Sequence, residues 1–170
     1  MALIKSVNEK TPRIPESCYL AENSTILGDV IIGEECSVWF NAIIRGDVNA
    51  IRIGNRVNIQ DGAVVHCTYE KASTNIGNNV SVGHNAIVHG CDLEDDVLIG
   101  MGAIVMDNAV VESGVIIAAG AVVLENTRCE SGWIYAGIPA KKVKQLAKEH
   151  AEQMISGTAD HYVSYMDWFK

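Results

Sequence analysis

The chain has 170 residues, a length typical of a single domain built around one core. Its 13 Lys and Arg residues against 21 Asp and Glu residues give a formal net charge of -8, which argues against a nucleic-acid partner because such surfaces concentrate positive charge. No apolar stretch approaches the roughly 20 residues that a membrane helix needs, and residues 1–24 lack the apolar block of a signal peptide. We therefore expect a soluble, cytoplasmic protein without a membrane partner.

The chain has five cysteines, an odd number, and none of them forms a CxxC pair. This pattern disfavours both a disulfide framework and a zinc ribbon, so we expect reduced thiols. Cys67 lies next to His66 and is a weak candidate ligand, because neighbouring side chains on a strand point to opposite faces.

A six-residue repeat runs from about Thr25 to Val123. An aliphatic residue recurs at every sixth position and is followed four positions later by a second small apolar residue, as in Ile59/Ala63 and Val82/Ala86. Each repeat predicts one short strand and one corner, and three repeats predict one triangular coil whose strands stack on the next coil at about 4.8 Å. The sequence therefore predicts a mainly β protein that forms a parallel β-helix. Glycines that follow the aliphatic residue, such as Gly54, are expected at corners whose backbone angles a Cβ would obstruct.

The repeat fades after Val123, which divides the chain into two parts. We expect residues 1–137 to form the β-helix prism and residues 138–170 to form a C-terminal helical segment packed on it. Apolar residues at helical spacing between Val143 and Met154 predict a helix, and Gly157 is expected to end it. The residues after Gly157 are then expected to form a second short helix or a tail.

Residues with the same phase in the repeat should stack into columns from coil to coil. Arg45, His66 and His89 each follow an inward aliphatic residue and share one column, whereas Asp61 and His84 share another. His84 and His89 are five residues apart, roughly 16 Å if extended at about 3.3 Å per residue, so one chain cannot readily bring both to one ion. If the edge with His84 faces the edge with His66 and His89 of a neighbour, three imidazoles converge, and a closed ring of such contacts makes a homotrimer.

Three imidazoles with an open fourth position form the ligand set of a catalytic zinc site, because structural zinc sites are normally closed by four protein ligands. Zn²⁺ is the metal we expect, and Fe²⁺ or Co²⁺ would also accept these ligands. The alternative is that these histidines are ordinary polar residues on the outside of a solenoid. Their matched columns favour the metal site.

The motifs resemble those of the gamma-class carbonic anhydrases from about Thr25 to Val123, and the resemblance reaches into the C-terminal helix. The residues that carry the resemblance are Arg45-Gly46-Asp47, Asn58-Ile59-Gln60-Asp61-Gly62, His66 and His84-Asn85-Ala86-Ile87-Val88-His89-Gly90. The resemblance implies a left-handed β-helix, a handedness that the repeat alone does not predict. It also implies a homotrimer with metals at its subunit interfaces and reversible hydration of CO2 to bicarbonate.

The same resemblance implies individual roles. His66 and His89 would bind the metal from one subunit and His84 from its neighbour, while Arg45 and Asp47 would form an intersubunit ion pair. The catalytic group would contain Gln60, which orients the water on the metal, Asn58 and Asp61 beside it, and Tyr162 near the C-terminus.

Two departures from the founding members make the chain resemble a shorter branch of the family, which implies a hydratase activity that is weak, dependent on conditions or absent. Val48 stands where they carry a glutamate, and the loop from Cys67 to Asn75 is short, with Glu70 as its one acid. Two alternatives remain open. Gly137-Ile138-Pro139-Ala140-Lys141 also resembles hexapeptide acyltransferases, which would make the protein an acyltransferase or thioesterase acting on a CoA ester. The chain would otherwise be a non-catalytic, metal-binding assembly subunit.

Overall fold

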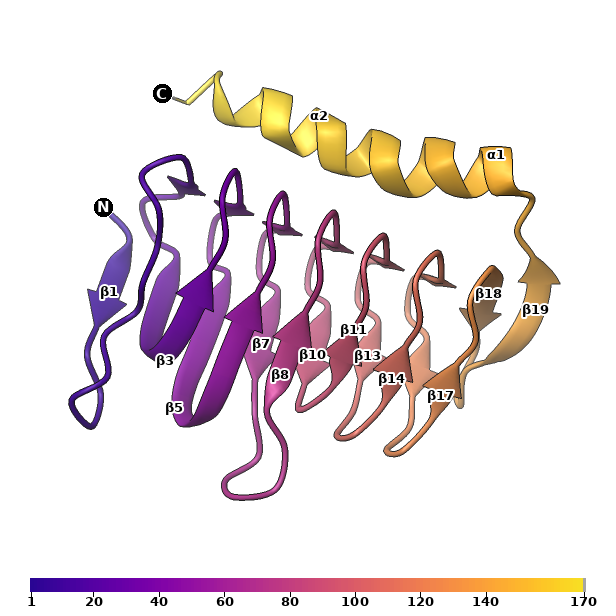
Figure 1. Cartoon of the computed structure of the whole chain (residues 1–170), viewed down its shortest axis with the longest axis horizontal. Helices are drawn as coiled ribbons and strands as arrows, with labels where there is room; N and C mark the ends of the chain where they lie inside the picture. The colour runs from indigo at the N-terminus through magenta and orange to yellow at the C-terminus, as the bar shows by residue number, and fades with distance from the viewer. Residues whose placement is uncertain (170) are drawn as a thin grey trace.

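The computed structural model describes residues 1–169 and shows a parallel solenoid with one helix laid along its length (Figure 1). The strands form two hydrogen-bonded sheets. One of these sheets bends within two long strands, β3 (Thr25–Ile32) and β5 (Ile43–Ile53), because the two ends of β5 pair with different later strands. The solenoid therefore has three faces. This architecture confirms the parallel β-helix predicted from the repeat and the C-terminal helix predicted from the apolar spacing that follows it.

Each face is a ladder of short strands from successive coils. The first face contains β1 (Leu3–Lys5), the first halves of β3 and β5, β7 (Val64–His66), β10 (Ile87–His89), β13 (Ile104–Val105) and β16 (Val122–Val123). The second face contains the second halves of β3 and β5, β8 (Thr74–Ile76), β11 (Asp92–Leu93), β14 (Val110–Val111) and β17 (Arg128–Cys129). The third face contains β2 (Tyr19–Leu20), β4 (Ser37–Val38), β6 (Asn58–Ile59), β9 (Ser81–Val82), β12 (Leu98–Ile99), β15 (Ile116–Ile117), β18 (Trp133–Ala136) and the antiparallel β19 (Lys141–Gln145).

The core is the interior of the prism, filled by the aliphatic residues of the repeat. Along the third face the inward positions of successive coils are Val38, Ile59, Val82, Ile99 and Ile117, which lie side by side in register and are buried. The side-chain direction alternates along a strand, so the residue beside each of these points outward. The repeat thereby fixes both the core and the residues displayed outside.

The glycines after the inward aliphatic residues are required because the next coil leaves no room for a Cβ, and not because their backbone angles are unusual. Gly54, for example, does not adopt a positive φ, but a Cβ there would approach the backbone of Gly77 in the next coil to 2.7 Å. The expected need for special backbone angles at these glycines is therefore wrong. Their role is to let one coil lie directly on another.

Left-handed backbone occurs instead at other positions of the corners, among them the corner between the third and first faces. Asn41, Gly62, Asn85, Gly102 and Gly120 occupy equivalent places there with φ between 57° and 69°. Each coil is tied to its neighbour at this corner, as when the Asn85 N–H donates to the carbonyl of Asp61. Asn and Gly tolerate this conformation better than other residues do. The preceding residue of every coil consequently projects from the same edge.

The C-terminal segment differs from the sequence prediction in two ways. Residues 141–145, expected to be helical, form β19, which pairs antiparallel with β18 and covers the last open strand edge of the third face. The helix runs through α1 (Lys148–Ala151), a π-helical stretch (Glu152–Ser156) and α2 (Gly157–Met166), so Gly157 does not end it. It returns along the prism toward the N-terminal coils (Figure 1).

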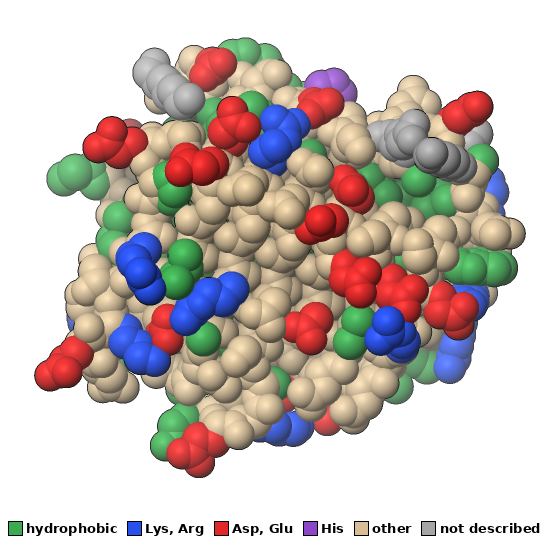
Figure 2. All heavy atoms as spheres, viewed as in Figure 1, with side chains coloured by type: hydrophobic (Ala, Val, Ile, Leu, Met, Phe, Trp, Pro, Cys, Tyr) green, Lys and Arg blue, Asp and Glu red, His purple; other side chains and the backbone are tan. Residues whose placement is uncertain are grey.

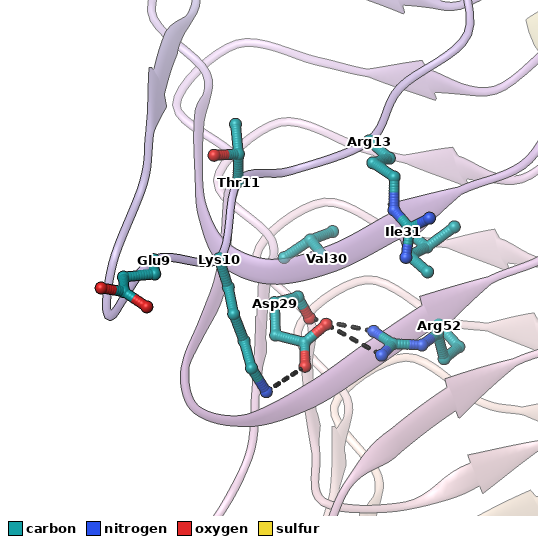
Figure 3. Close-up of a pocket in the computed structure, with 8 residues that line it drawn as sticks. All are labelled: Glu9, Lys10, Thr11, Arg13, Asp29, Val30, Ile31 and Arg52. Atoms are coloured by element: carbon teal, nitrogen blue, oxygen red, sulfur yellow. Dashed lines mark hydrogen bonds and ion pairs between the residues drawn. The ribbon is translucent and has the colours of Figure 1, made fainter.

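The N-terminal segment is tied to the first coils by charge. Asp29 accepts a hydrogen bond from Lys10 at 2.6 Å and pairs with Arg52 at 2.8 Å beside a hollow of about 360 Å³ (Figure 3). On the face shown in Figure 2, basic side chains gather over the N-terminal coils and acidic ones lie in a row over later coils. None of the helices in the described part of the chain is long and apolar enough to cross a bilayer.

Candidate metal centre

His66 and His89 are brought together by strand register. They end β7 and β10, which pair in parallel with His66 directly opposite His89, so the predicted column is confirmed. His66 Nδ1 and His89 Nε2 lie 3.1 Å apart. Two nitrogens bound to one tetrahedral zinc at about 2.05 Å are separated by about 3.3 Å. The two imidazoles therefore already stand at the spacing that a shared ion requires.

The other nitrogen of each ring is held by a carboxylate. His66 Nε2 lies 3.2 Å from Asp47 Oδ1, and His89 Nδ1 lies 2.7 Å from Asp107 Oδ1. A carboxylate partner places the ring hydrogen on the nitrogen facing it, so the opposite nitrogen keeps its lone pair. The lone pairs of His66 and His89 consequently face each other.

Electrostatics favours neutral imidazole at His66. Burial lowers the pKa of His66 below its usual value, and the positive charge of Arg45 lowers that pKa further, against the opposing effect of Asp47. Neutral imidazole is the form that binds a metal. The donor set at this edge of the prism thus fits a zinc-type ion.

Asp107 is a member of the site that sequence reasoning missed. It lies 18 residues after His89, one coil further along, in the turn that follows β13. Its side chain is 7% exposed and also accepts a hydrogen bond from Thr68 at 2.6 Å. Burial alone would raise the pKa of Asp107, but the hydrogen bonds from Thr68 and His89 outweigh it and hold that pKa below the usual range. The sequence signal that could have identified Asp107 is its spacing of 18 residues from His89, which equals one coil.

Arg45 and Asp47, the residues of the predicted intersubunit ion pair, are also in contact within the chain. Arg45 Nη1 lies 2.6 Å from Asp47 Oδ2, while the other oxygen of Asp47 faces His66. Burial would raise the pKa of Asp47, but the hydrogen bonds from Arg45 and His66 keep it below the usual range. Asp47 is therefore an anionic link between the guanidinium and the histidine.

His84 lies at the other edge of the first face. It occupies the corner between β9 and β10, one coil beyond Asp61, and its Nδ1 lies 2.9 Å from Asp61 Oδ2, as the predicted second column requires. The whole of β10 separates His84 from His89. Among the described residues, no three histidine, cysteine or acidic side chains of one chain converge as metal ligands. A single chain thus presents two imidazoles at one edge and the third at another.

The polar residues expected near the metal lie on the edge with His84. Gln60 Nε2 donates to Asn58 Oδ1 at 2.9 Å, and Asn58 Nδ2 donates to Ser81 Oγ at 2.8 Å. Asn58 and Gln60 are both buried. Because the amide nitrogen of Gln60 is engaged, its carbonyl oxygen is the free acceptor of this chain of hydrogen bonds.

Tyr162 reaches the same edge from α2. Its ring packs edge-on against Trp39 with centroids 5.5 Å apart, and it lines a hollow that also contains Gln60 and His84. Burial, assisted by the negative charge of Asp61, raises the pKa of Tyr162 to about 12. Its hydroxyl keeps its proton at neutral pH and can donate a hydrogen bond.

Comparisons with known proteins agree with these features. Residues 90–125 match the model of the bacterial transferase hexapeptide family (six repeats). The chain is 46% identical to a carbonic anhydrase of Geobacillus kaustophilus, covering 85% of this chain and 79% of that protein. It is 40% identical to the mitochondrial gamma carbonic anhydrase 2 of Arabidopsis thaliana, covering 95% of this chain and 59% of the plant protein.

A solved structure has the same fold from end to end. The crystal structure of a putative acetyltransferase of Bacillus cereus superposes with a TM-score of 0.94 at 37% identity and covers 99% of this chain and 96% of that one. The fold is thus shared by proteins named for two different activities. The sequence identity to these carbonic anhydrases extends over most of the chain and shows that this protein belongs to the gamma-class carbonic anhydrase family of hexapeptide-repeat proteins.

Proposed function

We propose that the protein catalyses the reversible hydration of CO2 to bicarbonate at a metal held between the subunits of a homotrimer. One observation carries the proposal: His66 and His89 direct free nitrogens at each other across 3.1 Å, each backed by a carboxylate. His84, held by Asp61, is the third ligand and comes from the neighbouring subunit. The five free cysteines fit the reducing conditions of the cytoplasm.

Zinc is the metal that we expect to bind the three imidazoles, and Fe²⁺ or Co²⁺ would also accept these ligands. When bound, such an ion lowers the pKa of a water molecule toward neutrality and so supplies a nucleophile for CO2. The second ring nitrogen of each histidine is anchored to Asp47, Asp107 or Asp61, which fixes the direction of the lone pair offered to the metal.

Residues of the chain then orient the reactants. The free carbonyl oxygen of Gln60 accepts a hydrogen bond from the attacking water, and Asn58 and Ser81 prevent the amide from turning over. The Tyr162 hydroxyl donates a hydrogen bond to the oxygen atoms of CO2 or bicarbonate, because it stays protonated at neutral pH. Proton export falls to Glu70 or to buffer, since Val48 replaces the acid of the founding members.

The decisive experiment mixes two inactive variants. His84→Ala and His66→Ala subunits are unfolded, combined in equal amounts, refolded and analysed for metal content and for CO2 hydration by stopped flow. If one site takes His84 from one subunit and His66 from the next, roughly one quarter of the sites in random trimers contain every ligand. Recovery of about a quarter of the wild-type metal and rate is expected. No recovery, with trimers formed, would place all ligands in one chain and refute the proposal.

The rival function is acyl transfer, favoured by the likeness to the putative acetyltransferase of Bacillus cereus. A transferase of this fold would bind coenzyme A. Calorimetric titration of the metal-loaded protein with coenzyme A separates the two, because tight binding supports the rival. Metal without hydration and without coenzyme A binding would instead support a non-catalytic assembly subunit.

A further inference from the structure

The outward positions of the third face change character halfway along the solenoid. After Tyr19 in the first coil they are polar, at Ser37, Asn58 and Ser81, and in the later coils they are apolar, at Leu98, Ile116 and Ile134. The change occurs in the coil after Ser81, directly beyond the coil that carries His84. An outward strand position is normally polar unless something covers it.

A groove of about 520 Å³ lies over these apolar residues. Its floor is formed by the third face, including Leu98, Ile116 and Ile134, and the helix contributes Met154 and Thr158 to its walls. At one end the lining becomes polar, with Gln60, His84 and Tyr162. The groove thus joins an apolar channel to the residues of the proposed active site.

Helix packing does not account for this groove. The helix uses Ile155, Ala159 and Met166 for packing, and these are at most 2% exposed. Met154, which lines the groove, is 47% exposed, and Leu98 and Ile134 are only half-buried. Apolar side chains are therefore left facing an open channel between the helix and the sheet.

Hydration of CO2 does not require the groove either. CO2 is a triatomic molecule, whereas pockets of about 300–1,000 Å³ with apolar walls and a few polar groups are typical of larger organic ligands. The polar end contains His84 and the Tyr162 hydroxyl, which can donate a hydrogen bond, so the head group of such a ligand would meet the site that handles bicarbonate. A carboxylate has the same planar O–C–O group as bicarbonate, with a carbon chain in place of the hydroxyl.

We infer that the protein binds medium-chain aliphatic carboxylates, with the head group at His84 and the hydroxyl of Tyr162 and the chain in the groove over Leu98 and Ile116. The position of the head group rests on the proposed metal site. The position of the chain rests on the groove alone. The active site accordingly accepts these carboxylates as well as bicarbonate.

Isothermal titration of the zinc-loaded, full-length protein with acetate, butyrate, hexanoate and octanoate tests the inference. Full burial of one methylene strengthens binding by about fourfold, so we expect the Kd to fall roughly two- to fourfold per methylene as far as hexanoate or octanoate. The same series of alkan-1-ols should show the chain-length dependence with weaker binding throughout, because alcohols lack the carboxylate.

Leu98→Ser is the matched variant, since it repeats the residue that Ser81 supplies at the same position one coil earlier. We expect it to remove most of the dependence on chain length. Val110→Ser changes a half-buried outward position of the second face and should leave that dependence intact. A Kd independent of chain length in the wild-type protein, together with normal CO2 hydration, would overturn this inference and leave the proposed function standing.

Discussion

The carboxylate of Asp107 holds His89 from the next coil, with 2.7 Å between Asp107 Oδ1 and His89 Nδ1. The same carboxylate accepts from Thr68 and lies 3.5 Å from the ammonium of Lys71. Thr68 and Lys71 belong to the short loop between β7 and β8. This loop therefore anchors the carboxylate that positions a proposed metal ligand.

Replacing Asp107 by Asn should weaken zinc binding by about 10- to 100-fold, the usual effect of losing a carboxylate partner of a ligating histidine. The amide has nearly the same shape, so the fold should survive. Competition with a chromophoric chelator measures the zinc affinity. Glu125→Gln is the control, because Glu125 pairs with Lys71 and not with His89. Equal zinc affinity in Asp107→Asn and Glu125→Gln would contradict the positioning role.

The repeat predicts the solenoid because one six-residue pattern specifies strand, corner and inward residue together. Stacking of successive coils then follows from spacing, and the register of His66 opposite His89 could be predicted in this way. Asp107 was missed because it is two positions after its inward residue, whereas His66 and His89 are one position after theirs. The corner turns its buried carboxylate back toward the preceding coil.

The C-terminal segment shows why periodicity was misleading there. Val143 begins a run of apolar residues at helical spacing, but residues 141–145 form β19 because β18 offers an unpaired strand edge. Backbone hydrogen bonds at such an edge override a weak local preference. Val143 is 58% exposed, so its apolar side chain was not a sign of burial against the prism.

The ion pairs of Asp29 should make the free energy of unfolding depend on pH in the acidic range. The hydrogen bond from Lys10, assisted by Arg52 and opposed by burial, holds the pKa of Asp29 below its usual value (Figure 3). Its contribution is then complete above the unfolded pKa of about 3.9 and is lost as the pH falls through the lower folded pKa. Asp29→Asn should lower the urea midpoint at pH 6, and this difference should shrink below pH 3. A difference that grows on acidification would show that the pKa of Asp29 is raised and not lowered by folding. Glu22→Gln, at an exposed turn, controls for the loss of one negative charge.

Shortening an inward residue should leave a cavity in the prism. Ile117 is fully buried, so Ile117→Ala should lower the free energy of unfolding by about 2–5 kcal/mol. Ile138 is 77% exposed, and Ile138→Ala should change it by less than about 0.5 kcal/mol. Denaturant unfolding at fixed protein concentration measures both. Similar losses in the two variants would argue against the core assigned to the repeat.

Gly54 and Gly102 are glycines for two different reasons: one lies against the next coil, and the other has a left-handed backbone. Gly54 has an ordinary φ, but an added Cβ would lie 2.7 Å from the backbone of Gly77, which cannot move without separating two coils. Gly102 has a φ of +66° and nothing within 4 Å of the added Cβ. Gly102→Ala should therefore cost only the backbone strain, about 1 kcal/mol, whereas Gly54→Ala should cost several times more.

Gly102→Asn should recover part of the strain, because Asn85 occupies the equivalent corner one coil earlier. Thermal unfolding of the three variants gives the order, and a Gly54→Ala protein as stable as Gly102→Asn would show that the coils are not in contact at Gly54.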